Sequence, residues 1–235
     1  MAISTVLFDL DGTLLPIRQI EFVKAYFDSI SRYIAPLGYK AEDLVASIKK
    51  GTYSMVNGDG TRPNEEIFWE VFCSIYGDKA LNDKPYFDRY YEEEFDKLKS
   101  YSSYNPKAAE TLYKLKDMGF RLVLATNPLF PPIAIQKRLN WAGLSHNDFE
   151  LYTTYENSSY CKPNPDYYRE IMKKQGLTPD ECIMVGNDVD DDMIASNTGM
   201  KVFLMTDYLI NRHDKDISVY PQGNFDDLLN YILRR

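Results

Sequence analysis

The sequence predicts an α/β fold: a doubly wound (Rossmann-like) parallel sheet core with an inserted α-helical cap domain. Three observations lead to this prediction. From about residue 100 onward, short apolar segments alternate with helix-length segments, an order that favours parallel strands joined by right-handed crossovers. Asn-Pro pairs precede two of these helices and glycines follow four of them, as is common at helix starts and stops. A segment that is too long to be a crossover connection precedes these strands and helices.

The first strand and the segment after it define the predicted domains. A strand is expected at residues 6–8, directly before Asp9. A helical stretch is expected from about residue 18 to about residue 100, because its apolar residues recur at helical spacing, as in Tyr86, Phe87, Tyr90, Tyr91, Phe95 and Leu98. We expect this aromatic stripe to pack in a core; a ligand surface is the alternative. The predicted domains are a core of residues 1–15 and 100–235 and a cap of residues 16–99.

The second half of the chain supplies the rest of the sheet and its helices. Further strands are expected at residues 121–125, 150–153, 183–185 and 201–205. Helices, with the glycines that end them, are expected at residues 105–119, 132–143, 164–176 and 191–199, and a last helix from Asn224 to the C-terminus. We find no internal repeat and no low-complexity tract, so all of these elements are assigned to one sheet domain.

Composition limits the possible functions. The chain has 235 residues, of which 44% are apolar and 26% charged, as in ordinary globular proteins. The apolar run near the N-terminus is interrupted by Asp9 and Asp11, so we expect neither a signal peptide nor a membrane span, and a cytoplasmic protein. A net charge of −8 argues against nucleic acid as a partner. The three cysteines lack metal-type spacing and are expected to be reduced thiols.

Polar residues follow four of the predicted strands at or near the point where each ends. In an open α/β sheet, ligands bind beyond the carboxyl ends of the strands, so these side chains are expected to meet at one edge. They are Asp9, Asp11 and Thr13 after the first strand, Thr126 and Asn127 after the second, Lys162 after the third, and Asn187, Asp188 and Asp190–Asp192 after the fourth.

This set of side chains suits magnesium and phosphate. Crowded carboxylates repel one another unless a cation neutralises them. Oxygen ligands without His or Cys favour Mg²⁺, which binds through one or two carboxylates together with phosphate and water. A lysine and a threonine at the same edge can hold phosphate oxygens, and a carboxylate can act as the nucleophile in phosphoryl transfer. A second carboxyl group two residues later can exchange protons with the leaving group and with water.

The order of these motifs resembles that of the haloacid dehalogenase (HAD) superfamily. The resemblance implies a Mg²⁺-dependent phosphatase that acts on a small phosphorylated metabolite, as a monomer or homodimer. Asp9 would be the nucleophile and a metal ligand, and Asp11 the general acid/base whose backbone carbonyl also touches the metal. The phosphoryl group would be bound by Thr126, Asn127 and Lys162.

The fourth motif departs from the common pattern of this superfamily. Asn187 stands directly after Gly186, where aspartate is common, and Asp188 follows it. Either Asn187 binds the metal through its amide oxygen, or Asp188 takes that role. Asp192 would orient a metal-bound water or Lys162. The sequence leaves this choice open.

Two alternative functions and the substrate stay open at this point. Receiver domains, which are non-catalytic phospho-acceptors, also gather acidic residues, a threonine and a lysine, but in a different chain order. A sugar-phosphate mutase would use the same pair of aspartates, whereas dehalogenases of the superfamily lack the second one, so Asp11 favours phosphate chemistry. For substrate selection by the insert, the candidates are Arg18, Glu21 and Phe22.

Overall fold

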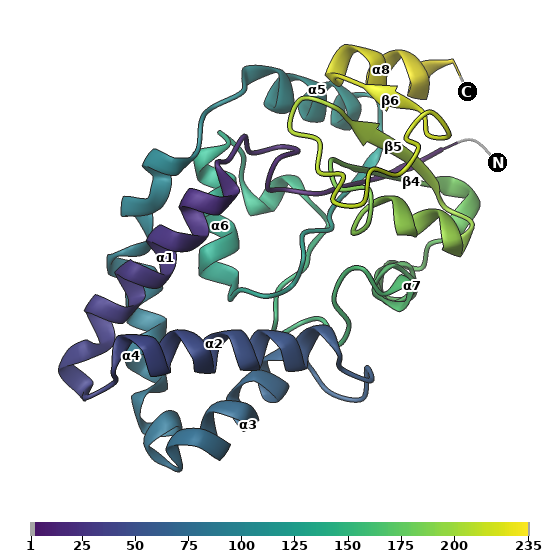
Figure 1. Ribbon diagram of the computed structural model, residues 1–235. Helices are drawn as coiled ribbons and strands as arrows, with labels where there is room; N and C mark the ends of the chain where they lie inside the picture. Colours follow the sequence, from purple (N-terminus) through teal and green to yellow (C-terminus); the bar gives the residue numbers. More distant parts are fainter. Residues whose placement is uncertain (1–2, 235) are drawn as a thin grey trace.

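A single parallel sheet forms the centre of the molecule (Figure 1). The computed structural model describes residues 3–234, and within them the sheet has six strands. These are β1 (Thr5–Phe8), β2 (Arg121–Leu124), β3 (Leu151–Tyr152), β4 (Cys182–Gly186), β5 (Lys201–Met205) and β6 (Gln222–Gly223). They lie in the order β3-β2-β1-β4-β5-β6, and all neighbours are parallel. The chain runs outward from β1 to β3 and returns beside β1 as β4, which confirms the doubly wound sheet.

Helices cover both faces of this sheet because alternate strand residues point to opposite sides. Val6 and Phe8 lie in one core with residues of α5 (Pro106–Asp117), α6 (Pro132–Trp141) and α8 (Phe225–Leu233). Leu7 lies in a second core with residues of α7 (Pro165–Gln175) and of a 3-10 helix, η5 (Met193–Thr198). The strands therefore consist of apolar residues on both faces, as expected for a buried parallel sheet.

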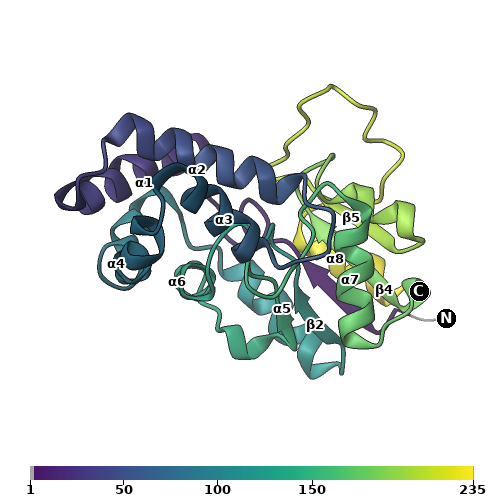
Figure 2. The ribbon, with the colours of Figure 1, turned by 90° about the horizontal axis from the view of Figure 1, so that it is seen from below.

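The helical insert follows β1 and extends to one side of the sheet (Figures 1 and 2). It contains α1 (Gln19–Ile34), α2 (Ala41–Val56), α3 (Asn64–Tyr76) and α4 (Lys79–Glu93), with 3-10 helices η1 (Ala35–Leu37) and η2 (Phe95–Tyr101). The rings of Phe95 and Trp141 stack at 5.4 Å, which joins the insert to α6. The insert therefore shares a continuous apolar core with one face of the sheet.

The aromatic stripe is mostly a packing surface, as expected. Its buried members are Phe87, Tyr90, Phe95 and Leu98. Tyr86 is exposed, and Phe87 and Tyr91 also line a cavity that is described below. The stripe therefore contributes to the core along most of its length and to a cavity at one point.

Three further details differ from or refine the sequence predictions. The helix expected at residues 191–198 is a 3-10 helix that begins at Met193, because the backbone N–H groups of Asp190 and Asp191 turn back to the Asp188 side chain. The two-residue strand β6 was not predicted, since it is too short to show a pattern. The last helix begins as predicted, with Asn224 accepting hydrogen bonds from the Asp226 and Asp227 N–H groups.

The cysteines and the membrane prediction can also be compared with the structure. All three cysteines are free thiols, as expected. Between residues 3 and 234, no helix is both long enough and apolar enough to cross a bilayer.

Candidate active site

The predicted site residues meet at the carboxyl ends of β1 and β4, where the winding of the sheet reverses. The two strands pair from Thr5 with Cys182 to Phe8 with Val185. The Asp9 N–H donates to the Val185 carbonyl at 2.9 Å, so the ladder continues through the first site residue. Ligands bind at such a reversal point in open α/β sheets.

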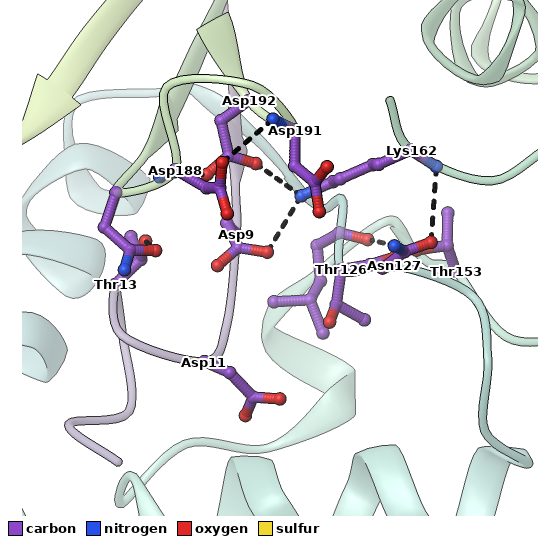
Figure 3. Close-up of polar contacts among 12 residues, drawn as sticks. Asp9, Asp11, Thr13, Thr126, Asn127, Thr153, Lys162, Asp188, Asp191 and Asp192 are labelled. Carbon is purple, nitrogen blue, oxygen red and sulfur yellow. Dashed lines mark hydrogen bonds and ion pairs between the residues drawn. The ribbon is translucent and has the colours of Figure 1, made fainter. Parts of the chain in front are cut away.

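Lys162 is the centre of the site (Figure 3). Its ammonium group donates to Asp9 Oδ1 at 2.8 Å and to Asp192 Oδ1 at 2.6 Å, and its side chain is 2% exposed. Burial disfavours its charge, but Asp192 and Asp9 outweigh burial and hold the Lys162 pKa well above its usual value. Burial raises the pKa of Asp192, and Lys162 opposes that rise. The lysine thus provides a fixed positive charge beside Asp9.

Gly186 makes room for this arrangement. A β-carbon at Gly186 would clash with the carboxylate of Asp192, so the carboxylate can approach the end of β4 only because no side chain stands there. The second oxygen of Asp192 accepts from the Asp188 N–H at 2.9 Å. The loop after β4 and the lysine are therefore held by the same carboxylate.

Asp188 itself is occupied on both of its oxygens. Its Oδ1 accepts from the N–H groups of Asp190 at 2.9 Å and Asp191 at 3.1 Å. Its Oδ2 pairs with Arg212 at 2.7 Å. Asp191 is partly buried beside it, and burial together with the Asp188 charge raises the Asp191 pKa to about 6.

Asn187 joins the loop after β4 to the turn after β1. Its amide nitrogen donates to the Tyr208 carbonyl at 2.6 Å, which fixes the orientation of the amide, and its oxygen accepts from the Thr13 hydroxyl at 3.1 Å. Gly12 has a φ of +87°, and a β-carbon there would clash with the Asn187 side chain. Only glycine suits this left-handed, crowded position.

Thr126 and Asn127 lie at the end of β2, on the other side of Lys162. The Thr126 carbonyl accepts from the hydroxyls of Thr153 at 2.6 Å and Tyr167 at 2.8 Å. Asn127 Oδ1 accepts from the Lys162 backbone N–H at 3.2 Å. Both residues line the same cavity as Asp9, so the structure brings all four predicted strand ends together.

Asp11 is held by Arg138, a residue that sequence reasoning missed. Asp11 Oδ2 pairs with Arg138 Nη1, while Asp11 Oδ1 and Arg138 Nη2 are buried without hydrogen-bond partners. Burial raises the Asp11 pKa, Arg138 lowers it and Asp9 raises it, with a net increase. Arg138 follows Ala134 and Ile135 on the apolar face of α6. A charged residue on an otherwise buried face was the available signal.

A cavity of about 280 Å³ connects this polar edge with the insert. Asp9, Asp11 and Lys162 line one part of it, and side chains of α1 to α4 line the other. Of the three candidates for substrate selection, Phe22 lines the cavity. Arg18 instead donates to the Ser100 carbonyl at 2.9 Å, and neither Arg18 nor Glu21 is among the lining residues that the structure describes.

The oxygen-rich part of the cavity suits a magnesium ion. Asp9, Asp11, Asn187 and Asp188 all line it, and Asn187 Oδ1 accepts only from Thr13 among the described residues. Within residues 3–234, no group of three or more His, Cys, Asp or Glu side chains is arranged to hold a metal alone. Mg²⁺ takes one or two carboxylates and completes its shell with other oxygens.

Comparison with known proteins places the chain among hydrolases. The family model described as haloacid dehalogenase-like hydrolase matches residues 3–197. The pyrophosphatase PpaX of Bacillus velezensis is 27% identical over 199 residues, which cover 85% of this chain and 81% of that protein.

Solved structures show the same fold. A predicted phosphoglycolate phosphatase from Haemophilus somnus superposes with a TM-score of 0.59 at 22% identity, covering 97% of both chains. A HAD phosphatase from Thermococcus onnurineus superposes with a TM-score of 0.57 at 19% identity, covering 98% of both chains.

Proposed function

Because the chain belongs to the haloacid dehalogenase-like hydrolases, we propose that it is a Mg²⁺-dependent phosphatase that cleaves a small phosphate ester through an aspartyl-phosphate at Asp9. The names of the relatives, a pyrophosphatase and a phosphoglycolate phosphatase, support phosphate as the group removed. The proposal includes the division into a core of residues 1–15 and 100–235 and a cap of residues 16–99.

The observation that carries this proposal is the position of Lys162 between Asp9 and Asp192, 2.8 Å and 2.6 Å from their oxygens. The ion pair with Lys162 holds the Asp9 carboxylate at the end of β1, where one of its oxygens can act as a nucleophile. The same cation can receive the negative oxygens of a phosphoryl group, which gain charge during transfer. An aspartate in a purely structural ion pair would not need Thr126 and Asn127 in the same cavity.

The proposed reaction has two steps. In the first, an Asp9 carboxylate oxygen bonds to phosphorus, the bond from phosphorus to the leaving oxygen breaks, and Asp11 gives its proton to that oxygen. In the second, Asp11 takes a proton from water, the water oxygen attacks phosphorus, and Asp9 is released with inorganic phosphate. Burial raises the pKa of Asp11 although Arg138 lowers it, and a rise is the direction that suits a group that gives a proton to the leaving oxygen. Arg138 positions the Asp11 carboxyl group, and Lys162 and Thr126 hold the phosphoryl oxygens.

A bound Mg²⁺ would neutralise charge on the phosphoryl oxygens. Asp9, the Asp11 backbone carbonyl and one residue of the fourth motif would hold it. For the last ligand we propose Asn187 rather than Asp188. Both Asp188 oxygens already accept hydrogen bonds or pair with Arg212, whereas Asn187 Oδ1 accepts only from Thr13 among the described residues and keeps a free lone pair.

The receiver-domain alternative is disfavoured by the sheet. Receiver domains have the strand order 2-1-3-4-5, whereas here β1 lies between β2 and β4. The order 3-2-1-4-5-6 agrees with the hydrolase proposal.

The test is to incubate the protein with phosphate monoesters and Mg²⁺, and to follow free phosphate and isomers of a hexose 1-phosphate together. A phosphatase releases phosphate as fast as the ester disappears, and EDTA abolishes the release. Accumulation of a sugar-phosphate isomer with little free phosphate would instead identify a mutase. Undiminished turnover after exhaustive chelation would exclude the metal-dependent mechanism.

A further inference from the structure

The part of the cavity away from Lys162 is walled by aromatic rings. They come from α1, α3, α4 and the segment after β2, and include Phe22, Tyr26, Phe27, Trp69, Tyr91 and Phe130. Tyr26 and Phe130 pack edge to face at 5.4 Å. The hydroxyls of Tyr26 and Tyr91 lie 2.8 Å apart and bond to each other, whereas the indole nitrogen of Trp69 is buried without a hydrogen-bond partner among the described residues.

Aliphatic side chains fill the gaps between the rings. Val23 and Ile30 of α1, Ile48 of α2 and Leu129 after β2 also line the cavity. A wall of this composition gains free energy when it covers apolar surface of a ligand. The volume of the whole cavity, about 280 Å³, lies just below the range for small-molecule pockets, which is roughly 300–1,000 Å³. It therefore suits a leaving group of about one ring or a short branched chain.

The cations of the cavity lie at its polar edge. Among the described lining residues the positively charged side chains are Lys162 and Arg138. Lys162 binds Asp9 and Asp192. Arg138 binds Asp11 through Nη1, and its Nη2 has no hydrogen-bond partner in the described part of the chain. Both belong to the polar edge, where a single phosphoryl group would bind.

The insert offers a negative rather than a positive group to the cavity. Asp88 of α4 is a lining residue, and it lies 3.2 Å from Lys84, outside the lining set. A second anionic group on a substrate would face aromatic rings and this carboxylate. Burying an unpaired charge in such surroundings is strongly unfavourable.

We infer that the substrate is a phosphate monoester whose leaving group is an uncharged, apolar alcohol, preferably one that carries an aromatic ring. This inference rests on the proposed phosphatase function and narrows it. It excludes good substrates that carry a second anionic group, such as pyrophosphate and phosphoglycolate. The phosphoryl group lies at Lys162, and the alcohol lies among the rings of the insert.

A panel of phosphate compounds tests the inference. Benzyl phosphate, ethyl phosphate, glycerol 3-phosphate and phosphoglycolate are esters of primary alcohols with leaving groups of similar reactivity, and pyrophosphate is an anhydride with a better leaving group. All five are assayed with Mg²⁺ for phosphate release. We expect kcat/KM for benzyl phosphate to exceed that for ethyl phosphate and phosphoglycolate by about 30-fold or more, since each buried CH₂ contributes about fourfold. Equal or faster turnover of phosphoglycolate, glycerol 3-phosphate or pyrophosphate would overturn the inference and leave the phosphatase proposal intact. No release from any compound would overturn both.

A pair of arginine variants on one helix separates the cavity wall from the surface. Val23 lines the cavity and is 41% exposed, so it has room for a longer side chain, whereas Ile20 is 84% exposed and lies outside the lining set. Val23→Arg should lower kcat/KM for benzyl phosphate about 10-fold and raise it for phosphoglycolate, because it adds a cation to the wall. Ile20→Arg should leave both values unchanged. An equal loss for both esters in Val23→Arg would contradict the inference.

Discussion

The two walls of the cavity are built in different ways. The polar wall consists of residues in the loops that follow the strands, and they are fixed by close contacts such as Lys162 with Asp9 and Gly12 with Asn187. The aromatic wall consists of side chains from several helices of the insert and from the segment after β2, and pairs of them pack edge to face. The comparison indicates that chemistry depends on single atoms in the first wall, whereas binding depends on total shape and polarity in the second.

The largest loss of activity is expected for a substitution of Asp9. Asp9→Asn keeps the size of the side chain but removes the attacking negative charge. We expect phosphate release to fall by about 10⁴-fold or more, as for other enzymes that lose a covalent nucleophile. The rate is measured at saturating ester and Mg²⁺, with circular dichroism to check folding.

Asp166→Asn is the matched control, because Asp166 is an exposed residue at the start of α7 that pairs with Arg169. It should retain wild-type activity. If Asp9→Asn kept more than a trace of turnover, Asp9 would not be the nucleophile, and the polar wall would have a different centre.

The second-largest loss of activity is expected for a substitution of Gly186. In Gly186→Ala the new β-carbon would clash with the Asp192 carboxylate, so Asp192 and with it Lys162 must move. A displacement of about 1 Å near a reacting centre costs roughly 100-fold in rate, and we expect a loss of about that size in kcat. Steady-state kinetics on a single ester would measure it.

Gly38→Ala provides the contrast, since Gly38 has no atom within 4 Å of an added β-carbon but has a φ of +87°. This variant should lose stability, by about 1 kcal/mol, without losing kcat. A Gly186→Ala protein with unchanged kcat would show that the polar wall tolerates shifts as the aromatic wall does.

The difference between the walls also explains what the sequence could predict. Asp9, Thr126, Lys162 and Asp192 follow strands that are visible as apolar runs, and parallel strands bring their carboxyl ends to one edge. Their meeting could therefore be predicted from order and spacing alone. The same reasoning located most helices, because Asn-Pro starts and glycine stops are local signals.

The aromatic wall could not be predicted in this way. Helical periodicity identifies an apolar face but not whether that face meets a core or a cavity, and Phe87 does both. Arg18 was a candidate for substrate selection, yet it donates to the Ser100 carbonyl. Arg138 was missed because its partner Asp11 lies 127 positions away in the chain, and only the packing of α6 brings the two together.

A moderate change in the Mg²⁺ requirement is expected for substitutions in the fourth motif. Asn187→Ala should raise the Mg²⁺ concentration needed for half-maximal activity by about 10- to 100-fold, as losses of metal-site groups commonly do. Asp188→Asn keeps an oxygen for the Asp190 and Asp191 N–H groups and should change this concentration less. A titration of activity with Mg²⁺ measures both variants. A larger shift in Asp188→Asn would identify Asp188 as the ligand in place of Asn187.

The smallest effect is expected at Glu156, which lies in the loop after β3 and is not among the described lining residues of the cavity. Glu156 is partly buried, and its Oε2 has no hydrogen-bond partner. Burial raises its pKa to about 7; a hydrogen bond from Thr154 lowers it, Glu65 of α3 raises it and Lys84 of α4 lowers it. The folded protein therefore prefers the protonated carboxyl group, whereas the unfolded chain ionises it near pH 4.3.

The free energy of unfolding should consequently fall as the pH rises from about 4.3 to about 7. Above that range, Glu156 should cause no further change. Glu156→Gln is neutral in both states and removes this loss. After allowance for partial exposure, we expect the variant to be about 1–2 kcal/mol more stable than wild type at pH 8, a few degrees in Tm, and no more stable at pH 4.5. Thermal unfolding of both proteins at the two pH values measures the difference. A Tm gain of equal size at both pH values would show that packing around Glu156, and not its charge, limits stability there.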